Sequence, residues 1–362
     1  MMRTLEWDYV TNELKMIDQR RLPGELVILS LRTCQEVVEA IRNMTIRGAP
    51  AIGAAAAFGL ALAARESGSR EAAGLLSDLE TAAKNLCASR PTAVNLAWAV
   101  GRVLRVVGPN PPLPPSLEGK GGWEDRSVDE LRAAVLAEAQ KMADEDVAVN
   151  KRMGEHGVAL IDDGDTIIHH CNTGALATVD WGTALGIIRM AHEQGKRVHV
   201  LVDETRPRLQ GARLTAWELG QYGIPYEIIS DNMAGHFLRT GQAQKVLFGA
   251  DRVAANGDVA NKIGTYMLAL AAHDNGVPAY SVVPTSSIDL SLAHGGLIPI
   301  EERPPDEVLE IQFESERVAP EGAKARNPAF DVTPNRLITA IVTENGIVYP
   351  PFEVNLPKVV KV

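Results

Sequence analysis

Beyond residue 161, short runs rich in valine and isoleucine alternate with helix-like segments, and this alternation limits the possible folds more than any other feature. Strands separated by helices of this length predict right-handed βαβ units and therefore a parallel sheet. We expect a Rossmann-like α/β domain whose strands include TIIHHC (166–171), RVHVLVDE (197–204), YEIIS (226–230), KVLFGAD (245–251) and PAYSVVP (278–284).

The first part of the chain has a different texture. Residues 5–30 contain two short β-like runs, LEWDYV and ELVIL, and residues 34–107 are alanine-rich with apolar positions at helical spacing. We therefore predict a mainly helical domain over residues 1–150 and an α/β catalytic domain over 151–362. The Pro/Gly-rich stretch 108–127 predicts a surface loop within the first domain.

Composition excludes several classes of protein. The 362 residues include only three cysteines, so neither a disulfide framework nor a zinc cluster is expected, and a reducing cytoplasm is the simplest compartment. The formal net charge of −10 argues against an extended nucleic-acid surface, which needs a basic footprint. No apolar run is long enough for a membrane span. A small phosphorylated ligand stays possible, because it needs only a few cations and backbone N–H groups.

Ligands of an open parallel sheet bind outside the carboxyl ends of its strands, so the residues that end each strand matter most. The first predicted strand ends at Cys171, the next at Asp203-Glu204, and a later one at Asp251. Cys171 precedes Asn172-Thr173-Gly174, which we interpret as a turn that opens a helix, a setting that favours negative charge on a thiol. The alternative for Cys171 is a small buried hydrophobe, which we assign to Cys34 and Cys87.

Other polar residues near these strand ends have plain structural alternatives. His169 is best interpreted as a buried core histidine. Asp203 and Glu204 could be catalytic, but pairing with Arg206, Arg208 or Arg213 is the better interpretation of so many mixed charges. Asp251 is followed by a loop that ends in Asn261-Lys262, before an apolar helix, where an oxyanion or phosphate contact would fit. A solvated lysine is the alternative for Lys262.

Two helix entrances of the first domain also fit an anion. Arg47 stands beside Gly48-Ala49, with Pro50 at the expected first turn, which predicts a small phosphate cradle. Arg90 precedes another apparent helix start. An ordinary helix entrance explains either motif equally well.

Several motifs are missing from the sequence. There is no GxGxxG loop after the first strand of the parallel domain, no GxxxxGK[ST], no GxSxG, and no HExxH or CxxC. We therefore expect neither a cofactor nor a metal.

Five blocks of sequence resemble the methylthioribose-1-phosphate isomerases. This family is grouped with ribose-1,5-bisphosphate isomerases and with the regulatory subunits of the translation-initiation guanine-nucleotide exchange factor. The resemblance runs in order from Arg47 almost to the C-terminus, through the blocks IRGAPAIG, HHCNTGALAT, VDETRPRLQGARLTAWEL, DNMAGH and GADRVAANGDVANKIGTYMLA.

The resemblance implies an aldose–ketose isomerisation in methionine salvage, without cofactor or metal, by a cytoplasmic homodimer. It implies that Cys171 and Asp251 are the catalytic pair. Substrate and phosphate contacts are expected from Arg47, Gly48, Ala49, Arg90, Gln210, Asn261 and Lys262.

Two alternatives stay open from the sequence. The same isomerase chemistry on ribose 1,5-bisphosphate would need a second cation cluster in place of an apolar pocket. A non-catalytic subunit that binds sugar phosphates or nucleotides would need neither Cys171 nor Asp251, so their joint presence at two strand ends favours an enzyme.

Overall fold

The computed structural model describes residues 3–91, 93–108 and 126–360. The chain forms two compact units, the first made of Met1–Ala148 with Ala175–Asp180 and the second of Val149–Gly174 with Trp181–Val362. Helix α5 (Val128–Gly157) runs through the division. The sequence-based division at residue 150 assigned 175–180 to the second domain, whereas the structure packs this segment with the first unit. Residues 109–125 of the predicted loop lie outside the described residues.

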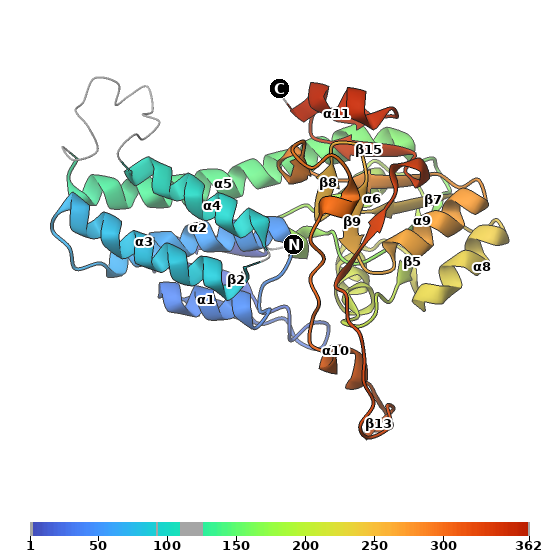
Figure 1. The fold of residues 1–362 in the computed structure, drawn as a ribbon, viewed down its shortest axis with the longest axis horizontal. Helices are drawn as coiled ribbons and strands as arrows, with labels where there is room; N and C mark the ends of the chain where they lie inside the picture. The colour runs from blue at the N-terminus through green and yellow to red at the C-terminus, as the bar shows by residue number, and fades with distance from the viewer. Residues whose placement is uncertain (1–2, 92, 109–125, 361–362) are drawn as a thin grey trace. The chain divides into compact units, whose positions relative to one another are not determined.

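The first unit combines a small antiparallel sheet with helices (Figure 1). A strand not expected from the sequence, β2, pairs with both of its neighbours. Helix α2 lies at the centre: every residue from Ala51 to Ala64 is buried, because alanine and glycine let the neighbouring helices α1, α3 and α4 approach closely. The elements are β1 (Leu5–Asp8), β2 (Glu13–Ile17), β3 (Ile28–Leu31), α1 (Cys34–Arg42), α2 (Ala49–Glu66), α3 (Ala72–Ser89) and α4 (Val94–Val107).

The second unit is built on a seven-stranded sheet with the order β16-β15-β10-β7-β4-β5-β6. All neighbouring pairs are parallel except β15 and β16. This confirms the predicted Rossmann-like α/β fold, and all five expected strands are present. The strands are β4 (Thr166–His169), β5 (His199–Asp203), β6 (Tyr226–Ile229), β7 (Lys245–Phe248), β10 (Ala279–Val282), β15 (Ala340–Thr343) and β16 (Gly346–Val348).

Helices cover both faces of this sheet, which explains why its strands are apolar on both sides. Ile167 packs into one core with α6 (Ala184–Glu193) and α7 (Ala216–Tyr222). The next residue, Ile168, packs into the opposite core, to which three further helices contribute. These are α8 (Ala234–Arg239), α9 (Thr265–Asp274) and α11 (Phe352–Val360).

A second, four-stranded sheet has the order β11-β8-β9-β14. Its strand β9 contains Asn261 and Lys262, so the prediction that these residues end a loop is wrong. The Asn256-Gly257-Asp258 turn closes a hairpin between β8 and β9, which makes the segment a strand. The strands are β8 (Arg252–Ala254), β9 (Val259–Lys262), β11 (Ile288–Asp289) and β14 (Phe330–Thr333).

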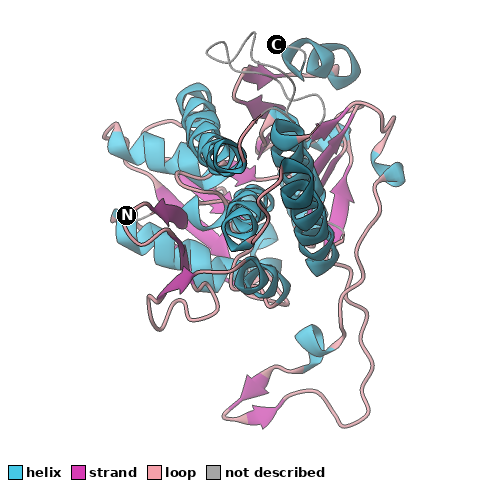
Figure 2. Ribbon diagram, turned by 90° about the vertical axis from the view of Figure 1, so that its left-hand side faces the viewer, coloured by secondary structure: helices cyan, strands magenta, loops and turns pink. Residues whose placement is uncertain are grey.

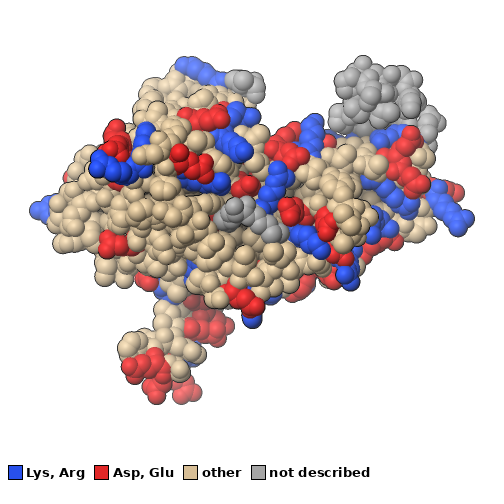
Figure 3. All heavy atoms as spheres, turned by 180° about the vertical axis from the view of Figure 1, so that it is seen from behind, with Lys and Arg blue, Asp and Glu red and all other residues tan. Residues whose placement is uncertain are grey.

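An arm projects from the second unit, as Figure 2 shows. It carries the short helix α10 (Asp306–Leu309) and a hairpin of β12 (Gln312–Phe313) and β13 (Glu316–Arg317). Acidic side chains gather at its tip in Figure 3, where Glu314 and Glu316 are exposed. Among the described residues, no helix is long and apolar enough to cross a membrane.

Candidate active site

Cys171 lies two residues beyond the end of β4, at the carboxyl edge of the parallel sheet. Its side chain is largely buried, and its backbone has a φ of 67°, which is uncommon for a residue other than glycine. Two threonine hydroxyls hold the peptide groups on either side: the Cys171 N–H donates to Thr205 Oγ1 at 2.9 Å, and Thr215 Oγ1 donates to the Cys171 carbonyl at 2.7 Å. The backbone of the cysteine is therefore fixed from both directions.

The segment after Cys171 corrects one expectation. Asn172-Thr173-Gly174 leads only into a single 3₁₀ turn, Ala175–Ala177, and the next α-helix, α6, begins at Ala184. The Asn172 side chain instead donates to Glu218 Oε1 at 2.8 Å and to Thr215 Oγ1 at 3.2 Å. A turn of three residues aligns few peptide dipoles, so the argument that a helix N-terminus favours negative charge on Cys171 loses most of its support.

The neighbouring strand β5 ends at Asp203, which pairs with a histidine and not with an arginine as the sequence suggested. Asp203 Oδ2 lies 2.8 Å from His170 Nδ1, and both side chains are buried. His170 Nε2 lies 2.9 Å from the carbonyl oxygen of Ile263. Because a carbonyl oxygen only accepts, Nε2 carries a hydrogen, and a second proton lies between Nδ1 and the carboxylate.

The surroundings favour a shared proton in this pair. Burial lowers the pKa of His170, but the hydrogen bond and charge of Asp203, together with the charge of Asp231, outweigh burial, and the net change is upward. Burial raises the pKa of Asp203 to about 6, against the opposing effect of the His170 hydrogen bond. The pKa values of both side chains are raised, so the pair holds its shared proton more tightly than the separate side chains would.

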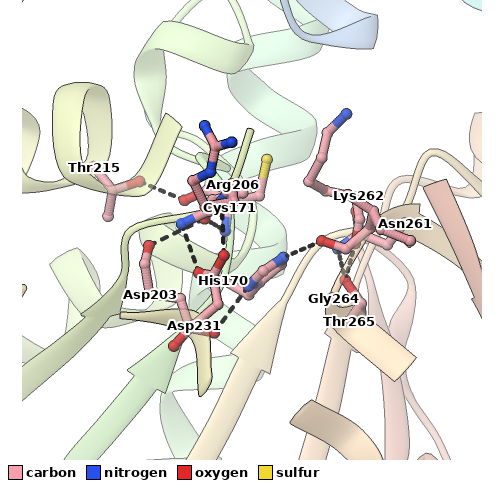
Figure 4. A network of polar contacts seen from close by, with 12 residues as sticks. His170, Cys171, Asp203, Arg206, Thr215, Asp231, Asn261, Lys262, Gly264 and Thr265 are labelled. Atoms are coloured by element: carbon pink, nitrogen blue, oxygen red, sulfur yellow. Dashed lines mark hydrogen bonds and ion pairs between the residues drawn. The ribbon is translucent and has the colours of Figure 1, made fainter. Parts of the chain in front are cut away.

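Asp231, just beyond β6, organises the backbone that follows Asp203. Its two oxygens accept the N–H groups of Thr205 and Arg206, each at 2.7 Å. Ligand-type atoms of His170, Asp203 and Asp231 lie within 4.8 Å of one another, a spacing that a metal ion could use. In the described structure, hydrogen bonds engage both ring nitrogens of His170 and both oxygens of Asp231, and hold the three side chains as a network (Figure 4).

His169 has the environment expected of a core residue. It is completely buried, and its Nε2 lies 3.3 Å from Thr173 Oγ1. Burial, with a smaller contribution from His170, lowers the pKa of His169 to about 3, so the ring is neutral at physiological pH.

Asp251 follows β7, the strand next to β4, so its position and that of Cys171 share one edge of the sheet. The Asp251 N–H donates to Ala260 in β9 at 2.9 Å. Further along β9, Lys262 Nζ donates to the Ala329 carbonyl at 2.8 Å and lies 4.6 Å from the centre of the Phe330 ring. In Figure 4 the Cys171 thiol and the Lys262 ammonium point to the same side of the network.

Gln210 immediately precedes a π-helical turn, Gly211–Thr215, on the loop after β5. It is buried, and its Oε1 has no hydrogen-bond partner within the described part of the chain. The basic residues nearby have structural contacts: Arg208 pairs with Glu307 at 2.6 Å, and Arg206 donates to the carbonyls of Pro207 and Val308. These contacts attach the loop to α10 at the base of the arm.

The remaining predicted contacts belong to the first unit. Arg47, Gly48 and Ala49 stand at the start of α2, and Arg90 follows the last residue of α3. Gly48 has a φ of 90°, and a Cβ there would come within 2.2 Å of the Ala177 carbonyl oxygen. Close packing against the segment 175–180 is therefore sufficient to require glycine at this position.

The second unit thus contains the predicted residues Cys171, Asp251, Gln210, Asn261 and Lys262. The sequence prediction missed the network behind them, namely His170, Thr205 and Asp231. One signal for it was present, since Asp231 follows the strand YEII at the same kind of strand end as Asp203 and Asp251.

Comparisons with known proteins agree with this architecture. The model of the Initiation factor 2 subunit family matches residues 45–350. A methylthioribose-1-phosphate isomerase from Synechococcus sp. is 53% identical over 341 residues, which are 94% of this chain and 93% of the relative.

Two solved structures match the whole chain. The 5-methylthioribose 1-phosphate isomerase from Pyrococcus horikoshii OT3 is 44% identical, with a TM-score of 0.89 over 100% of this chain and 96% of that one. The translation initiation factor eIF-2B, subunit delta, from A. fulgidus is 43% identical, with a TM-score of 0.86 over 100% of both chains.

The fold and the family match define the class: the chain belongs to the Initiation factor 2 subunit family. Within that family it groups with the methylthioribose-1-phosphate isomerases, since eight relatives that carry this name are 47–53% identical over at least 94% of the chain.

Proposed function

We propose that this chain is an isomerase that converts 5-methylthioribose 1-phosphate into 5-methylthioribulose 1-phosphate, in methionine salvage. The observation that carries the proposal is its identity of 47–53% with full-length relatives named methylthioribose-1-phosphate isomerase. The adjacent strand ends that carry Cys171 and Asp251 support it, because an aldose–ketose isomerisation needs two groups that move protons at different atoms.

The substrate defines the chemical problem. Its phosphate occupies the anomeric carbon, so the sugar has no free aldehyde, and the bond between C1 and the ring oxygen must break during isomerisation. We assign the Cys171 thiol as the donor of a proton to the departing ring oxygen. We assign Asp251 as the acceptor of the proton from the C2 hydroxyl as the ketone forms.

Atoms and charges balance in this scheme. Hydrogen moves from C2 to C1 either as a hydride, or as a proton that Asp251 takes from C2, leaving an enol, and returns to C1 before it accepts the proton of the C2 hydroxyl. The active site ends with a thiolate and a protonated carboxyl group, and return of one proton restores the starting state.

Binding would use the polar groups around this edge. The buried Gln210 Oε1 suits a sugar hydroxyl, since it has no hydrogen-bond partner in the described structure. Asn261 and Lys262 are proposed substrate contacts on β9. Arg47, Gly48, Ala49 and Arg90 are proposed contacts contributed by the first unit, with the cations directed at the phosphate.

We further propose that the enzyme works in the cytoplasm as a homodimer, without cofactor or metal. The three free cysteines of the chain fit a reducing compartment. Sedimentation equilibrium would test the dimer, and a monomer at micromolar concentration would contradict it.

Proton NMR of the purified protein with methylthioribose 1-phosphate in D2O tests the function. Appearance of the ketose supports it, and failure to convert this substrate contradicts it. Deuterium at C1 of the product would indicate proton exchange through an enolate, whereas its absence would favour a hydride shift or a shielded proton.

One observation favours a second candidate. The structure named as an initiation factor subunit is 43% identical to this chain over its full length. A regulatory subunit would bind a sugar phosphate or nucleotide without turnover. In the same experiment, inactivity toward methylthioribose 1-phosphate and toward ribose 1,5-bisphosphate, with binding retained, would support this alternative.

A further inference from the structure

His170 links two parts of the site that lie on different strands. Through Nδ1 it contacts Asp203, and through Nε2 it contacts the carbonyl of Ile263, the residue after Lys262. The ring is completely buried and immediately precedes Cys171 in the chain. The His170 ring therefore joins the end of β5 to the turn before α9.

On the first side, the contacts lead to the backbone of Cys171. Thr205 Oγ1 donates to the Asp203 carbonyl at 3.0 Å and accepts the Cys171 N–H at 2.9 Å. Asp231 fixes the Thr205 N–H at 2.7 Å. Both Cys171 and Thr205 have left-handed backbones, with φ of 67° and 63°, a conformation that persists only where the surroundings enforce it.

On the second side, the contacts lead to the turn between β9 and α9. Gly264 has a φ of 103°, and a Cβ there would meet His170 Cε1 at 2.9 Å, so the turn is shaped to let the imidazole approach. Asp331 accepts the N–H groups of Gly264 at 2.7 Å and Tyr266 at 3.1 Å. This turn directly follows Asn261 and Lys262, the proposed substrate contacts.

We propose that His170 is a positioning residue with two separable functions: its Nδ1 side holds the Cys171 backbone for the chemical step, and its Nε2 side holds the Asn261–Lys262 segment for substrate binding. This inference rests on the proposed isomerase function and adds a residue that touches neither of the reacting carbons. The imidazole acts only through the groups to which it donates.

The charges around His170 suit a ring that donates on both sides. A neutral imidazole has one N–H, so it would turn a lone pair either to the Asp203 carboxylate or to the Ile263 carbonyl, and one link would be lost. The ionisable groups that influence it are Asp203 and Asp231, which raise its pKa, its neighbour His169, and Asp331, whose carboxyl it affects in turn.

Two amide substitutions separate the functions. His170→Asn places an amide nitrogen near the position of Nδ1, so it retains the donor to Asp203 and loses the donor to Ile263. His170→Gln places its amide nitrogen near the position of Nε2 and retains the opposite contact. We expect His170→Asn to raise KM about tenfold with kcat within about threefold of wild type, and His170→Gln to lower kcat about 10- to 100-fold with KM nearly unchanged.

The matched control is the adjacent buried histidine. His169→Asn and His169→Gln remove an imidazole of equal size whose Nε2 lies next to Thr173 Oγ1, so they should lower the melting temperature without separating kcat from KM. Calorimetric titration with the ketose product checks that the KM change reflects binding. The positioning function is wrong if both His170 variants change kcat and KM in the same way, or if neither variant changes either constant.

If the isomerase proposal itself is wrong, wild-type protein shows no turnover, and this is seen before any variant is compared.

If both His170 variants fail to fold, Thr205→Val tests the contacts between His170 Nδ1 and the Cys171 backbone alone. It removes the hydroxyl that accepts the Cys171 N–H while keeping the shape of the side chain. A loss of kcat of about tenfold or more with unchanged KM supports the proposal, and unchanged kcat overturns it.

Discussion

Cys171 shows how much of a site depends on the backbone of one residue. Its left-handed conformation is held by Thr205 and Thr215, which lie 34 and 44 residues further along the chain. No local pattern in the sequence signals this conformation, because the residues that enforce it come from the loop after another strand. The position of Cys171 at a strand end was predictable, whereas the geometry of its backbone was not.

The proposed proton transfers predict the behaviour of two variants. Cys171→Ser replaces the thiol by a much weaker acid, and Asp251→Asn removes the carboxylate, so each should lower kcat about 10²- to 10⁴-fold. Binding of the ketose product, measured by calorimetry, should persist because the other contacts are unchanged. Wild-type turnover in either variant would show that the residue does not transfer the proton assigned to it.

His169 provides a prediction for stability against pH. Its folded pKa is about 3, below the ordinary value of 6.5, so between these values the unfolded chain binds the extra proton. The stability associated with neutral His169 is present above pH 6.5 and is lost as pH falls toward 3, with a slope of up to about 1.4 kcal/mol per pH unit.

Urea unfolding of wild type and His169→Gln at pH 7, 6, 5 and 4 measures this effect. The glutamine does not titrate, so the stability of wild type relative to the variant should decrease as the solution becomes more acidic. A difference that stays constant or grows over this range would mean that His169 binds its proton at least as readily in the folded protein as in the unfolded chain.

At the scale of elements, strand ends were predicted better than the segments between them. The strands that end near Cys171, Asp203 and Asp251 follow from apolar runs and flanking turns. The helix expected after Gly174 is only one 3₁₀ turn, Ala175–Ala177, and the segment Ala175–Asp180 packs with the first unit, a long-range contact that local periodicity does not contain. Asn261 and Lys262 form the polar half of β9, so the strand lacks the apolar run that predicts the others.

Helix α1 gives a prediction that depends on local structure alone. Its N-cap Thr33 accepts the Glu36 N–H at 3.2 Å, and Glu36 accepts the Thr33 N–H at 3.0 Å, which forms a capping box. Thr33→Ala should lower the free energy of unfolding by about 1 kcal/mol, while Thr33→Ser should retain the bond and most of the stability. Equal losses in both variants, measured by urea unfolding, would contradict the role of the hydroxyl.

At the scale of the whole molecule, the segment Ala175–Asp180 belongs to the first unit, although the residues on both sides of it belong to the second. Thr4 donates to the Ala175 carbonyl at 2.6 Å and Gln19 to the Leu176 carbonyl at 2.7 Å, while the Val179 N–H donates to Asp146 at 2.8 Å. The side chains of Ala175, Leu176 and Val179 are buried. The first unit is therefore completed by residues that follow the first strand of the second.

We therefore expect that a fragment of residues 149–362 does not stay soluble and monodisperse by itself. It would expose the apolar side chains of 175–180, so we expect aggregation in size-exclusion chromatography and binding of a hydrophobic dye. Adding residues 1–148 as a second chain should restore a soluble complex. Leu176→Ser with Val179→Ser should improve the isolated fragment, and a monodisperse wild-type fragment would contradict the expectation.

The same segment has a consequence for the descent of such proteins. Most two-domain proteins can exchange a domain when recombination replaces one continuous stretch of a gene. Here any single stretch that carries the parallel sheet from Val149 onward also carries six residues of the helical unit. A new helical partner would have to accept that foreign piece in its core, so the two halves should be inherited together.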